Sequence, residues 1–243
     1  LERTNTVHAR KVLMLAGCVQ PVLTPNTNAC ASNLLNKFDI EVIEAPGNLC
    51  CGAAAFHTSE PDYGMRQVKQ LIDSWWPHIE AGVEAIVVTA TGCGASVKDY
   101  GRLLADDPVY ADKAQKVSSL YCDLIEFVEA EVEPTNPSEL PVKRVAVHTP
   151  CTMQHGLGII NRVEALLAKA GYEICAVEDA HLCCGSAGTY SMLQPALATQ
   201  LHTNKVRALS IDQPDVIATS NIGCQVHLAQ GNKTPIVHWI ELL

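Results

Sequence analysis

The two halves of the chain repeat one pattern of cysteines, and each copy is built around a Cys-Cys-Gly triplet. A cysteine precedes the triplet by 32 positions in both copies, so three cysteines recur at a constant offset of 133 residues (18 to 151, 50 to 183 and 51 to 184). Four soft thiolates in each half predict a metal site, with iron–sulfur as the leading candidate. The expected ligands are Cys18, Cys50, Cys51 and Cys93 in the first copy and Cys151, Cys183, Cys184 and Cys224 in the second.

The spacing of these cysteines bears on the choice of metal. Structural zinc sites also take four thiolates, but they usually present them as pairs of Cys-x-x-Cys knuckles. The sequence has no such knuckle. It therefore favours a [4Fe–4S] cluster, one or two in the chain, with zinc or a mixed outcome as the alternative.

The remaining cysteines, Cys30, Cys122 and Cys175, have no counterpart in the other half. We expect them to be small buried hydrophobic residues, the first two in helices and Cys175 in a strand. A disulfide framework is disfavoured because the total of eleven is odd, the N-terminus has no secretory apolar stretch, and vicinal cysteines bridge each other poorly. These features predict a reducing, cytoplasmic compartment.

Each half alternates short apolar runs with amphipathic stretches, which is typical of parallel α/β sheets. We predict strands at about 11–15, 40–45 and 85–89, and again at 144–147, 173–177 and 216–219, with helices at about 28–38, 63–81, 158–170 and 193–209. The fold class is thus α/β, with two tandem Rossmann-like repeats related by pseudo-twofold symmetry. The expected domains are 1–129 and 143–243, separated by an acidic, proline-rich linker at 130–142.

In this arrangement every repeated cysteine follows the carboxyl end of a strand, where open α/β sheets place their ligands. Four histidines lie near these cysteines: His148, His155, His181 and His227. We interpret them as ordinary polar residues at the mouths of loops, with a ligand or proton-relay role as the alternative.

Composition excludes several function classes. The net charge of −9, with no basic run, argues against a nucleic-acid partner, and no apolar run is long enough for a membrane span. The sequence has no glycine-rich phosphate-binding motif and no hydrolase motif. Redox chemistry remains.

The duplicated Cys-x31-Cys-Cys-Gly pattern resembles the cysteine-rich CCG domain family. Members include the cysteine-rich subunit of heterodisulfide reductase, lactate-utilisation proteins and the iron–sulfur subunits of anaerobic glycerol-3-phosphate dehydrogenase and of glycolate oxidase, and the resemblance is greatest to the last of these. It is carried by Gly17-Cys18-Val19-Gln20-Pro21, Pro25-Asn26-Thr27-Asn28, His181-Leu182-Cys183-Cys184-Gly185-Ser186-Ala187-Gly188-Thr189-Tyr190, Asn221-Ile222-Gly223-Cys224 and His238-Trp239-Ile240-Glu241-Leu242.

This resemblance implies an electron-transfer subunit of a glycolate-oxidising (glycolate dehydrogenase) complex, with no independent active site in the chain. FAD-binding partner subunits would oxidise glycolate to glyoxylate, and electrons would pass through this subunit towards a quinone or another membrane carrier. The implied location is cytoplasmic, with peripheral attachment to the inner face of the cell membrane as an alternative.

Two departures from the family pattern limit what the resemblance implies. The ferredoxin-like region that usually precedes these domains is missing, so we expect either a C-terminal part or a truncated member. Heterodisulfide reductase-type members end each motif in Cys-x-x-Cys, but Ala90 and Asn221 replace the first of those cysteines here. Four ligands per half favour an ordinary cubane cluster. A heterodisulfide reductase-like, lactate or glycerol-3-phosphate oxidoreductase subunit and a zinc-stapled scaffold remain as alternatives.

Overall fold

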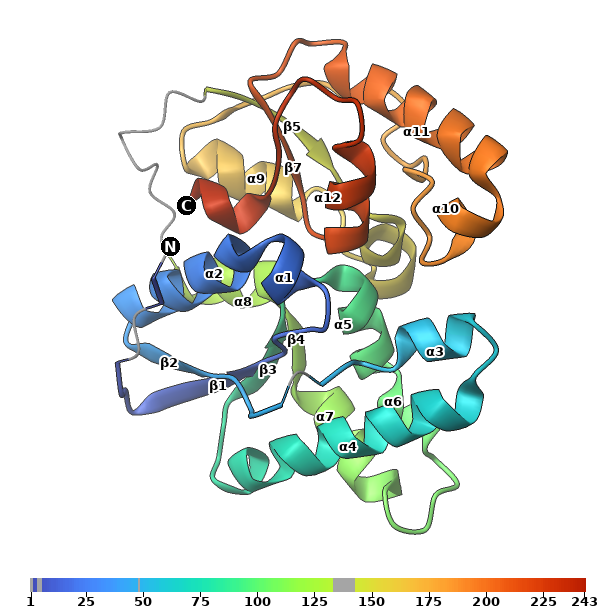
Figure 1. Ribbon diagram of the computed structural model, residues 1–243. Helices are drawn as coiled ribbons and strands as arrows, with labels where there is room; N and C mark the ends of the chain where they lie inside the picture. The colour runs from blue at the N-terminus through green and yellow to red at the C-terminus, as the bar shows by residue number, and fades with distance from the viewer. Residues whose placement is uncertain (1, 4–5, 48, 133–142) are drawn as a thin grey trace. The chain divides into compact units, whose positions relative to one another are not determined.

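Each half of the chain builds a four-stranded parallel sheet with helices on both faces (Figure 1). The strand orders are β2-β1-β3-β4 in the first half and β6-β5-β7-β8 in the second. The computed structural model describes residues 2–3, 6–47, 49–132 and 143–243. These form two units, Leu1–Val132 and Glu133–Leu243. The predicted α/β class, with one parallel sheet per repeat, is confirmed. Most of the predicted linker, from residue 133 to 142, lies outside the described residues.

In the first unit, each strand of the sheet is followed by one or more helices. Its elements are β1 (Arg10–Met14), α1 (Gln20–Leu23), α2 (Pro25–Lys37), β2 (Ile40–Ile43), α3 (Ala53–His57), α4 (Pro61–Glu80), β3 (Ala85–Val88), α5 (Thr91–Lys98), α6 (Tyr100–Leu103), α7 (Ala111–Leu120), β4 (Tyr121–Asp123) and α8 (Leu124–Glu131). Helices α2 and α8 lie on one face of the sheet, and α4 and α7 on the other (Figure 1).

The second unit repeats this plan with fewer helices. Its elements are β5 (Arg144–His148), the π-helix η1 (Thr152–Leu157), α9 (Arg162–Lys169), β6 (Glu173–Ile174), α10 (Tyr190–Leu193), α11 (Pro195–Ser210), β7 (Val216–Thr219), α12 (Ile222–Leu228), β8 (Ile236–His238) and the C-terminal 3-10 turn η2 (Trp239–Leu242). Helix α9 and η2 cover one face of this sheet, and α11 covers the other (Figure 1).

Both sheets have a fourth strand that the prediction of three strands per half missed. β4 pairs with β3, and β8 pairs with β7, both in parallel. Each is only three residues long, which is too short to display an alternating pattern in the sequence. The prediction that Cys122 lies in a helix is wrong for the same reason, because Cys122 is the middle residue of β4.

The helix predicted at 158–170 begins later than expected. A π-helix, η1, follows β5 directly, and Asn161 then adopts a left-handed conformation (φ +60°) that separates it from α9. The apolar face of α9 is buried as its periodicity predicts, through Val163, Leu166 and Leu167. The irregular backbone at 152–161 thus interrupts the amphipathic pattern only at its start.

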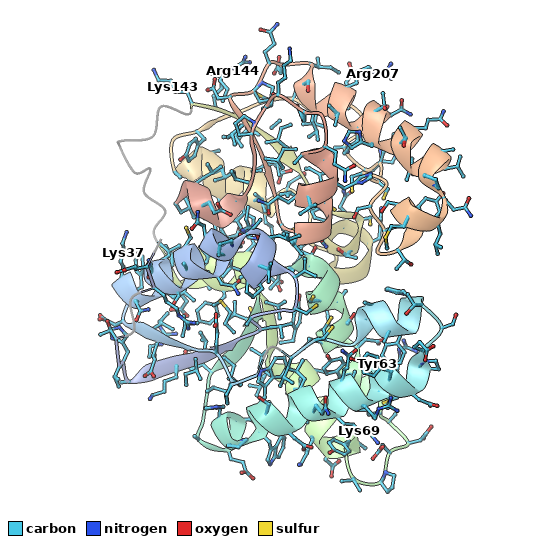
Figure 2. All side chains as sticks on the ribbon, viewed as in Figure 1. Lys37, Tyr63, Lys69, Lys143, Arg144 and Arg207 are labelled. Atoms are coloured by element: carbon cyan, nitrogen blue, oxygen red, sulfur yellow. The ribbon has the colours of Figure 1, made fainter. Side chains whose placement is uncertain are left out.

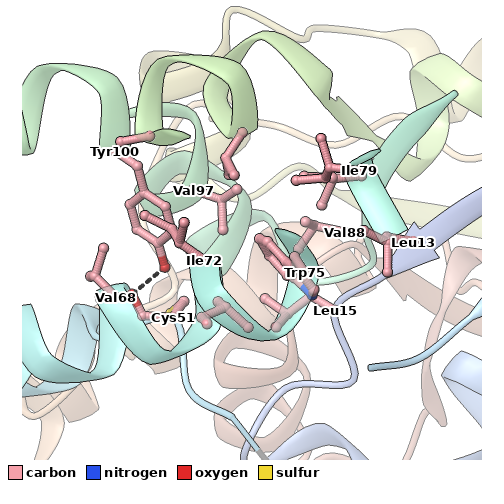
Figure 3. Close-up of a cluster of buried hydrophobic side chains, with 14 of the residues drawn as sticks. Leu13, Leu15, Cys51, Val68, Ile72, Trp75, Ile79, Val88, Val97 and Tyr100 are labelled. Atoms are coloured by element: carbon pink, nitrogen blue, oxygen red, sulfur yellow. Dashed lines mark hydrogen bonds between the residues drawn. The ribbon is translucent and has the colours of Figure 1, made fainter. Parts of the chain in front are cut away.

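The apolar core of the first unit fills the space between the sheet and α4, α5, α6 and α7 (Figure 3). Leu13 and Leu15 from the sheet meet Trp75, which is only 1% exposed. Cys51 belongs to the same cluster. The core therefore extends up to one of the repeated cysteines.

Charged side chains are spread over the described surface rather than gathered in a stripe. Lys37 ends α2, Lys69 lies on α4 and Arg207 lies on α11 (Figure 2). None of the helices in the described ranges combines the length and the apolar character that crossing a membrane requires.

Replacing Trp75 by alanine should destabilise the first unit strongly. A fully buried tryptophan leaves a large cavity when truncated, at a cost of about 3–5 kcal/mol. Its neighbour Trp76 is the matched control, because it is only partly buried and has Lys113 over its ring, 5.2 Å from the centroid. Denaturant unfolding of the full chain, followed by circular dichroism, should show a smaller loss for Trp76→Ala. Equal losses would contradict the assignment of Trp75 to the core.

Candidate metal centres

In the first unit, three neighbouring strands deliver four cysteines to one edge of the sheet. Cys18 lies in the loop after β1, Cys50 and Cys51 follow β2, and Cys93 lies in the first turn of α5, after β3. The strands are adjacent in the order β2-β1-β3 and all parallel. Their carboxyl ends therefore meet at a single edge, as the sequence predicts.

The thiols of this group lie in contact. The Cys18 thiol donates to the Sγ of Cys50 across 3.6 Å, and Cys51 interacts with both Cys50 and Cys93. A disulfide would bring two sulfurs to about 2.05 Å, so Cys18 and Cys50 are free thiols. The structure thus assembles all four predicted cysteines of the first half into one chain of contacts.

The second unit repeats the arrangement on its own sheet. Cys151 caps η1 after β5, Cys183 and Cys184 follow β6, and Cys224 lies in the first turn of α12, after β7. Cys151 hydrogen-bonds to Cys183, and Cys184 interacts with Cys183 and Cys224. All four predicted cysteines of the second half are brought together as well.

The acidity of these thiols alternates along each chain of contacts. The pKa of Cys50 is lowered far below that of an ordinary thiol because Cys18 and Cys51 hydrogen-bond to it, and the backbone N–H of Gly52 adds a third contact at 3.5 Å. The pKa of Cys51 is raised by its hydrogen bonds to Cys50 and Cys93 and by burial. Metals bind the thiolate form, so a bound metal would displace the protons of these thiols.

The same alternation holds in the second unit. The pKa of Cys183 is lowered by Cys151 and Cys184, and the N–H of Gly185 lies 3.3 Å from its sulfur. The pKa of Cys224 falls to about 5, first because of Cys184, and burial opposes this shift. Soft donors, free thiols and N–H groups aimed at sulfur form a set that fits an iron–sulfur cluster or a thiolate-bound metal ion.

A family profile for the cysteine-rich domain (CCG) matches the chain twice, at residues 12–98 and 145–229. The chain belongs to the CCG family. Each match begins in the first strand of its unit and contains all four of the cysteines described above.

Among similar proteins, the glycolate oxidase iron–sulfur subunit of Escherichia coli is 48% identical over 97% of this chain, which spans 58% of that protein's length. Lactate utilization protein A of Bacillus velezensis is 25% identical, and the match covers 96% of this chain and 98% of that protein. Lactate utilization protein A of Bacillus subtilis is 23% identical with the same coverage.

The glycine of each CCG triplet is required by backbone conformation and by packing. Gly52 has φ +84° and Gly185 has φ +93°, a region that side chains rarely adopt. A Cβ at Gly185 would lie 2.6 Å from the carbonyl oxygen of Ala198 in α11, and one at Gly52 would lie 2.9 Å from that of Gly64 in α4. The helix after each triplet therefore packs directly against the triplet's backbone.

A buried polar network holds the Cys18 loop in the first CCG unit. The amide nitrogen of Gln20 donates to Asn28 (2.7 Å) and to Thr89 (2.6 Å), and the amide of Asn28 donates to the carbonyl of Ala16 (3.0 Å). The network joins the loop to the end of β3, close to Cys93. Gln20 and Asn28 stand in the motifs that carry the family resemblance, so the sequence did contain a signal for them.

Tyr100 supports the first CCG triplet and was missed by the sequence reasoning. Its hydroxyl, on α6, donates to the carbonyl of Cys51 at 2.7 Å within the apolar core (Figure 3). Burial raises the pKa of this hydroxyl well above its ordinary value, so it remains a donor. Tyr100 thereby satisfies a backbone oxygen that would otherwise be unpaired beside the thiols.

Lys205 supports the loop before the second CCG triplet and was also missed. It is 2% exposed, and its ammonium group donates to the carbonyls of Asp179 (3.1 Å) and Ala180 (2.8 Å). Burial lowers its pKa, while Cys184 and Asp179 act in the opposite direction. A lysine within a helix carries no local sequence signal for hydrogen bonds to carbonyls more than twenty residues away.

The N-cap residues of the helices that carry Cys93 and Cys224, Ala90 and Asn221, differ between the units. Asn221 is the N-cap of α12, where its side-chain oxygen accepts from the N–H of Gly223 at 2.8 Å. Ala90 is the N-cap of α5 and has no side chain that could do this. Asn221 therefore stabilises the helix turn that carries Cys224.

Two of the three remaining cysteines have a contact with a backbone carbonyl. Cys122 donates to the carbonyl of Asp123 at 3.5 Å, and Cys175 lies 4.0 Å from that of Asp212. Cys175 is buried just beyond β6, and burial raises its pKa. Cys30 is half-buried in α2, the helix in which it was predicted.

The histidines divide into two kinds. His181 is exposed in a turn, in agreement with its interpretation, whereas His155 is exposed but lies within η1 rather than in a loop. His227 lies on α12, with its ring centroid 5.1 Å from that of His202. His148 was misjudged: it is not at a loop mouth but at the end of β5, only 1% exposed.

Gly185→Ala should destabilise the second CCG unit far more than Gly231→Ala. Gly231 also has a positive φ (+70°), but a Cβ there meets no described atom within 4 Å, so it isolates the conformational cost of about 1–2 kcal/mol. At Gly185 the clash with Ala198 adds to this cost and must displace the triplet. Thermal unfolding of the two variants measures the difference. Similar melting temperatures would contradict the close approach of α11.

Proposed function

We propose that this chain is an iron–sulfur electron-transfer subunit of a glycolate-oxidising complex. The observation that carries the proposal is the convergence, in both units, of four free thiols from three parallel strand ends. Sequence similarity to the Escherichia coli glycolate oxidase iron–sulfur subunit supports the assignment to glycolate. We also propose that the chain has two domains, at 1–129 and 143–243, joined by a linker at 130–142.

In the first unit Cys18, Cys50, Cys51 and Cys93 would hold one [4Fe–4S] cluster, and in the second Cys151, Cys183, Cys184 and Cys224 would hold another. Such a group supplies reversible one-electron transfer when bound. The chain's own part is to bind and orient it. The N–H groups of Gly52 and Gly185 donate towards sulfur, and such donors make reduction more favourable.

Oxidation of glycolate to glyoxylate releases two electrons and two protons, whereas an iron–sulfur cluster passes one electron at a time. We therefore assign the oxidation to FAD-binding partner subunits, which a flavin suits, and propose that this chain has no active site of its own. Electrons would leave towards a quinone or another membrane carrier. We place the complex in the cytoplasm, with attachment to the inner face of the membrane as the alternative.

A second candidate is electron transfer in lactate oxidation. It is favoured by the lactate utilization proteins A, nearly the whole length of which this chain spans. The partner complex, co-purified with this chain, distinguishes the two. Reduction of the chain's chromophore by glycolate but not by L-lactate supports the first proposal, and the reverse supports the second.

Iron, sulfide and zinc analysis of anaerobically purified protein tests the proposal directly. We expect iron and sulfide in equal amounts, about four or eight of each per chain, and an EPR signal after reduction. Zinc without sulfide would overturn the electron-transfer role and make these domains a zinc-stapled scaffold, whose fold would be lost on chelation.

Single cysteine replacements should separate ligands from core residues. Cys51→Ser and Cys184→Ser should each abolish metal loading in one unit and halve the iron per chain of a fully loaded protein, because a serine replaces a soft thiolate. Cys30→Ser and Cys175→Ser are the matched controls and should leave the iron content unchanged, at a small cost in stability. If all four variants lost iron alike, our division of the cysteines would be wrong.

A further inference from the structure

The two CCG units differ at the position just before the loop that carries the first cysteine. His148 ends β5, and the residue 133 positions earlier, Leu15, follows β1 in the first unit. Leu15 is part of the apolar core there. Its register neighbour shows the same change: Thr219, the partner of His148 on β7, corresponds to Val88 at the end of β3. The second unit thus places two polar side chains where the first has two apolar ones.

Outside the cluster of cysteine thiols, His148 has no partner among the groups that the structure describes. Its ring is 1% exposed, and neither Nδ1 nor Nε2 makes a hydrogen bond to a described atom other than those sulfurs. A buried ring nitrogen without a partner is unfavourable, so an imidazole in this position needs a bonding partner. The described surroundings are closed to solvent, since β5, β7 and α12 enclose the strand end with buried residues.

Two of the clustered cysteine thiols of the second unit lie beside the ring. One ring nitrogen of His148 and the sulfurs of Cys184 and Cys224 all lie within 4.8 Å of one another, and all three residues are buried. One imidazole nitrogen with two thiolates is a donor set that both iron and zinc accept.

We propose that His148 binds the metal group of the second unit directly, through a ring nitrogen. This inference rests on the proposed function and deepens it: five donors face the site in the second unit and four in the first. The imidazole adds a neutral donor to the four thiolates, so the second centre would have nitrogen as well as sulfur ligands, which the first lacks. The two units of one chain would then hold electronically different centres.

The decisive experiment detects the nitrogen itself. Full-length protein is prepared with ¹⁵N-labelled histidine in a Cys51→Ser background, so that only the second unit carries a cluster, and is studied by pulsed EPR after reduction. We expect a strong ¹⁵N hyperfine coupling of the size given by a directly bound imidazole. The coupling should vanish in His148→Leu, which copies Leu15 of the first unit, and persist in His155→Leu, where an exposed histidine is removed. Only the weak coupling of a hydrogen-bonded ring, or none, would overturn the proposal.

The reciprocal background provides the second control. In Cys184→Ser, where only the first unit is loaded, no histidine coupling should appear, because Leu15 takes the place of His148. A cluster that forms normally in the second unit without histidine coupling would refute the ligand role of His148 and leave the electron-transfer function intact. If His148→Leu does not fold, the presence or absence of the ¹⁵N coupling in the labelled Cys51→Ser protein still decides the question.

Absence of iron and sulfide would instead refute the proposed function, and His148 could still be tested. Cobalt(II) bound to the full chain reports its ligands through its absorption spectrum. We then expect a spectrum for the second unit that changes in His148→Leu and not in His155→Leu. Identical spectra for all three proteins would overturn the inference for any metal.

Discussion

Each cluster of four cysteine thiols depends on the parallel alignment of three neighbouring strands. Because β2, β1 and β3 run in the same direction, their carboxyl ends open onto one edge, and cysteines as far apart in sequence as Cys18 and Cys93 become part of one group. The second sheet does the same with β6, β5 and β7. Register within the sheet, rather than local sequence, therefore sets which sulfurs meet.

Bringing four thiols together has an electrostatic consequence that the fold must manage. Several thiolates cannot share a half-buried site without repelling one another, and this explains why Cys50 and Cys183 are the acidic members while their neighbours keep protons. The N–H groups of the triplet glycines offset only part of the negative charge. A bound cation offsets the rest, so metal binding and the stability of these loops are coupled.

The sequence predicted the strand ends and the grouped cysteines because both leave local signals, apolar runs and a repeated spacing. It could not predict contacts whose partners are backbone atoms distant in the chain. Tyr100 donates to the carbonyl of Cys51, and Lys205 to that of Asp179. β4 and β8 are recognisable only through their pairing with β3 and β7. His148 was misjudged because the strand extends one residue further than the apolar pattern suggests.

The duplicated cysteines are surrounded by different chemistry. The residue 133 positions before Lys205 is Ile72, so the buried amine of the second unit replaces an apolar side chain of the first core. By the same offset, the imidazole of His148 replaces Leu15. A cationic amine favours additional negative charge at the neighbouring site, whereas an apolar wall opposes it. The four repeated cysteines of the second unit therefore stand in a less apolar environment, in which the charge of Lys205 favours the reduced form of a bound cluster.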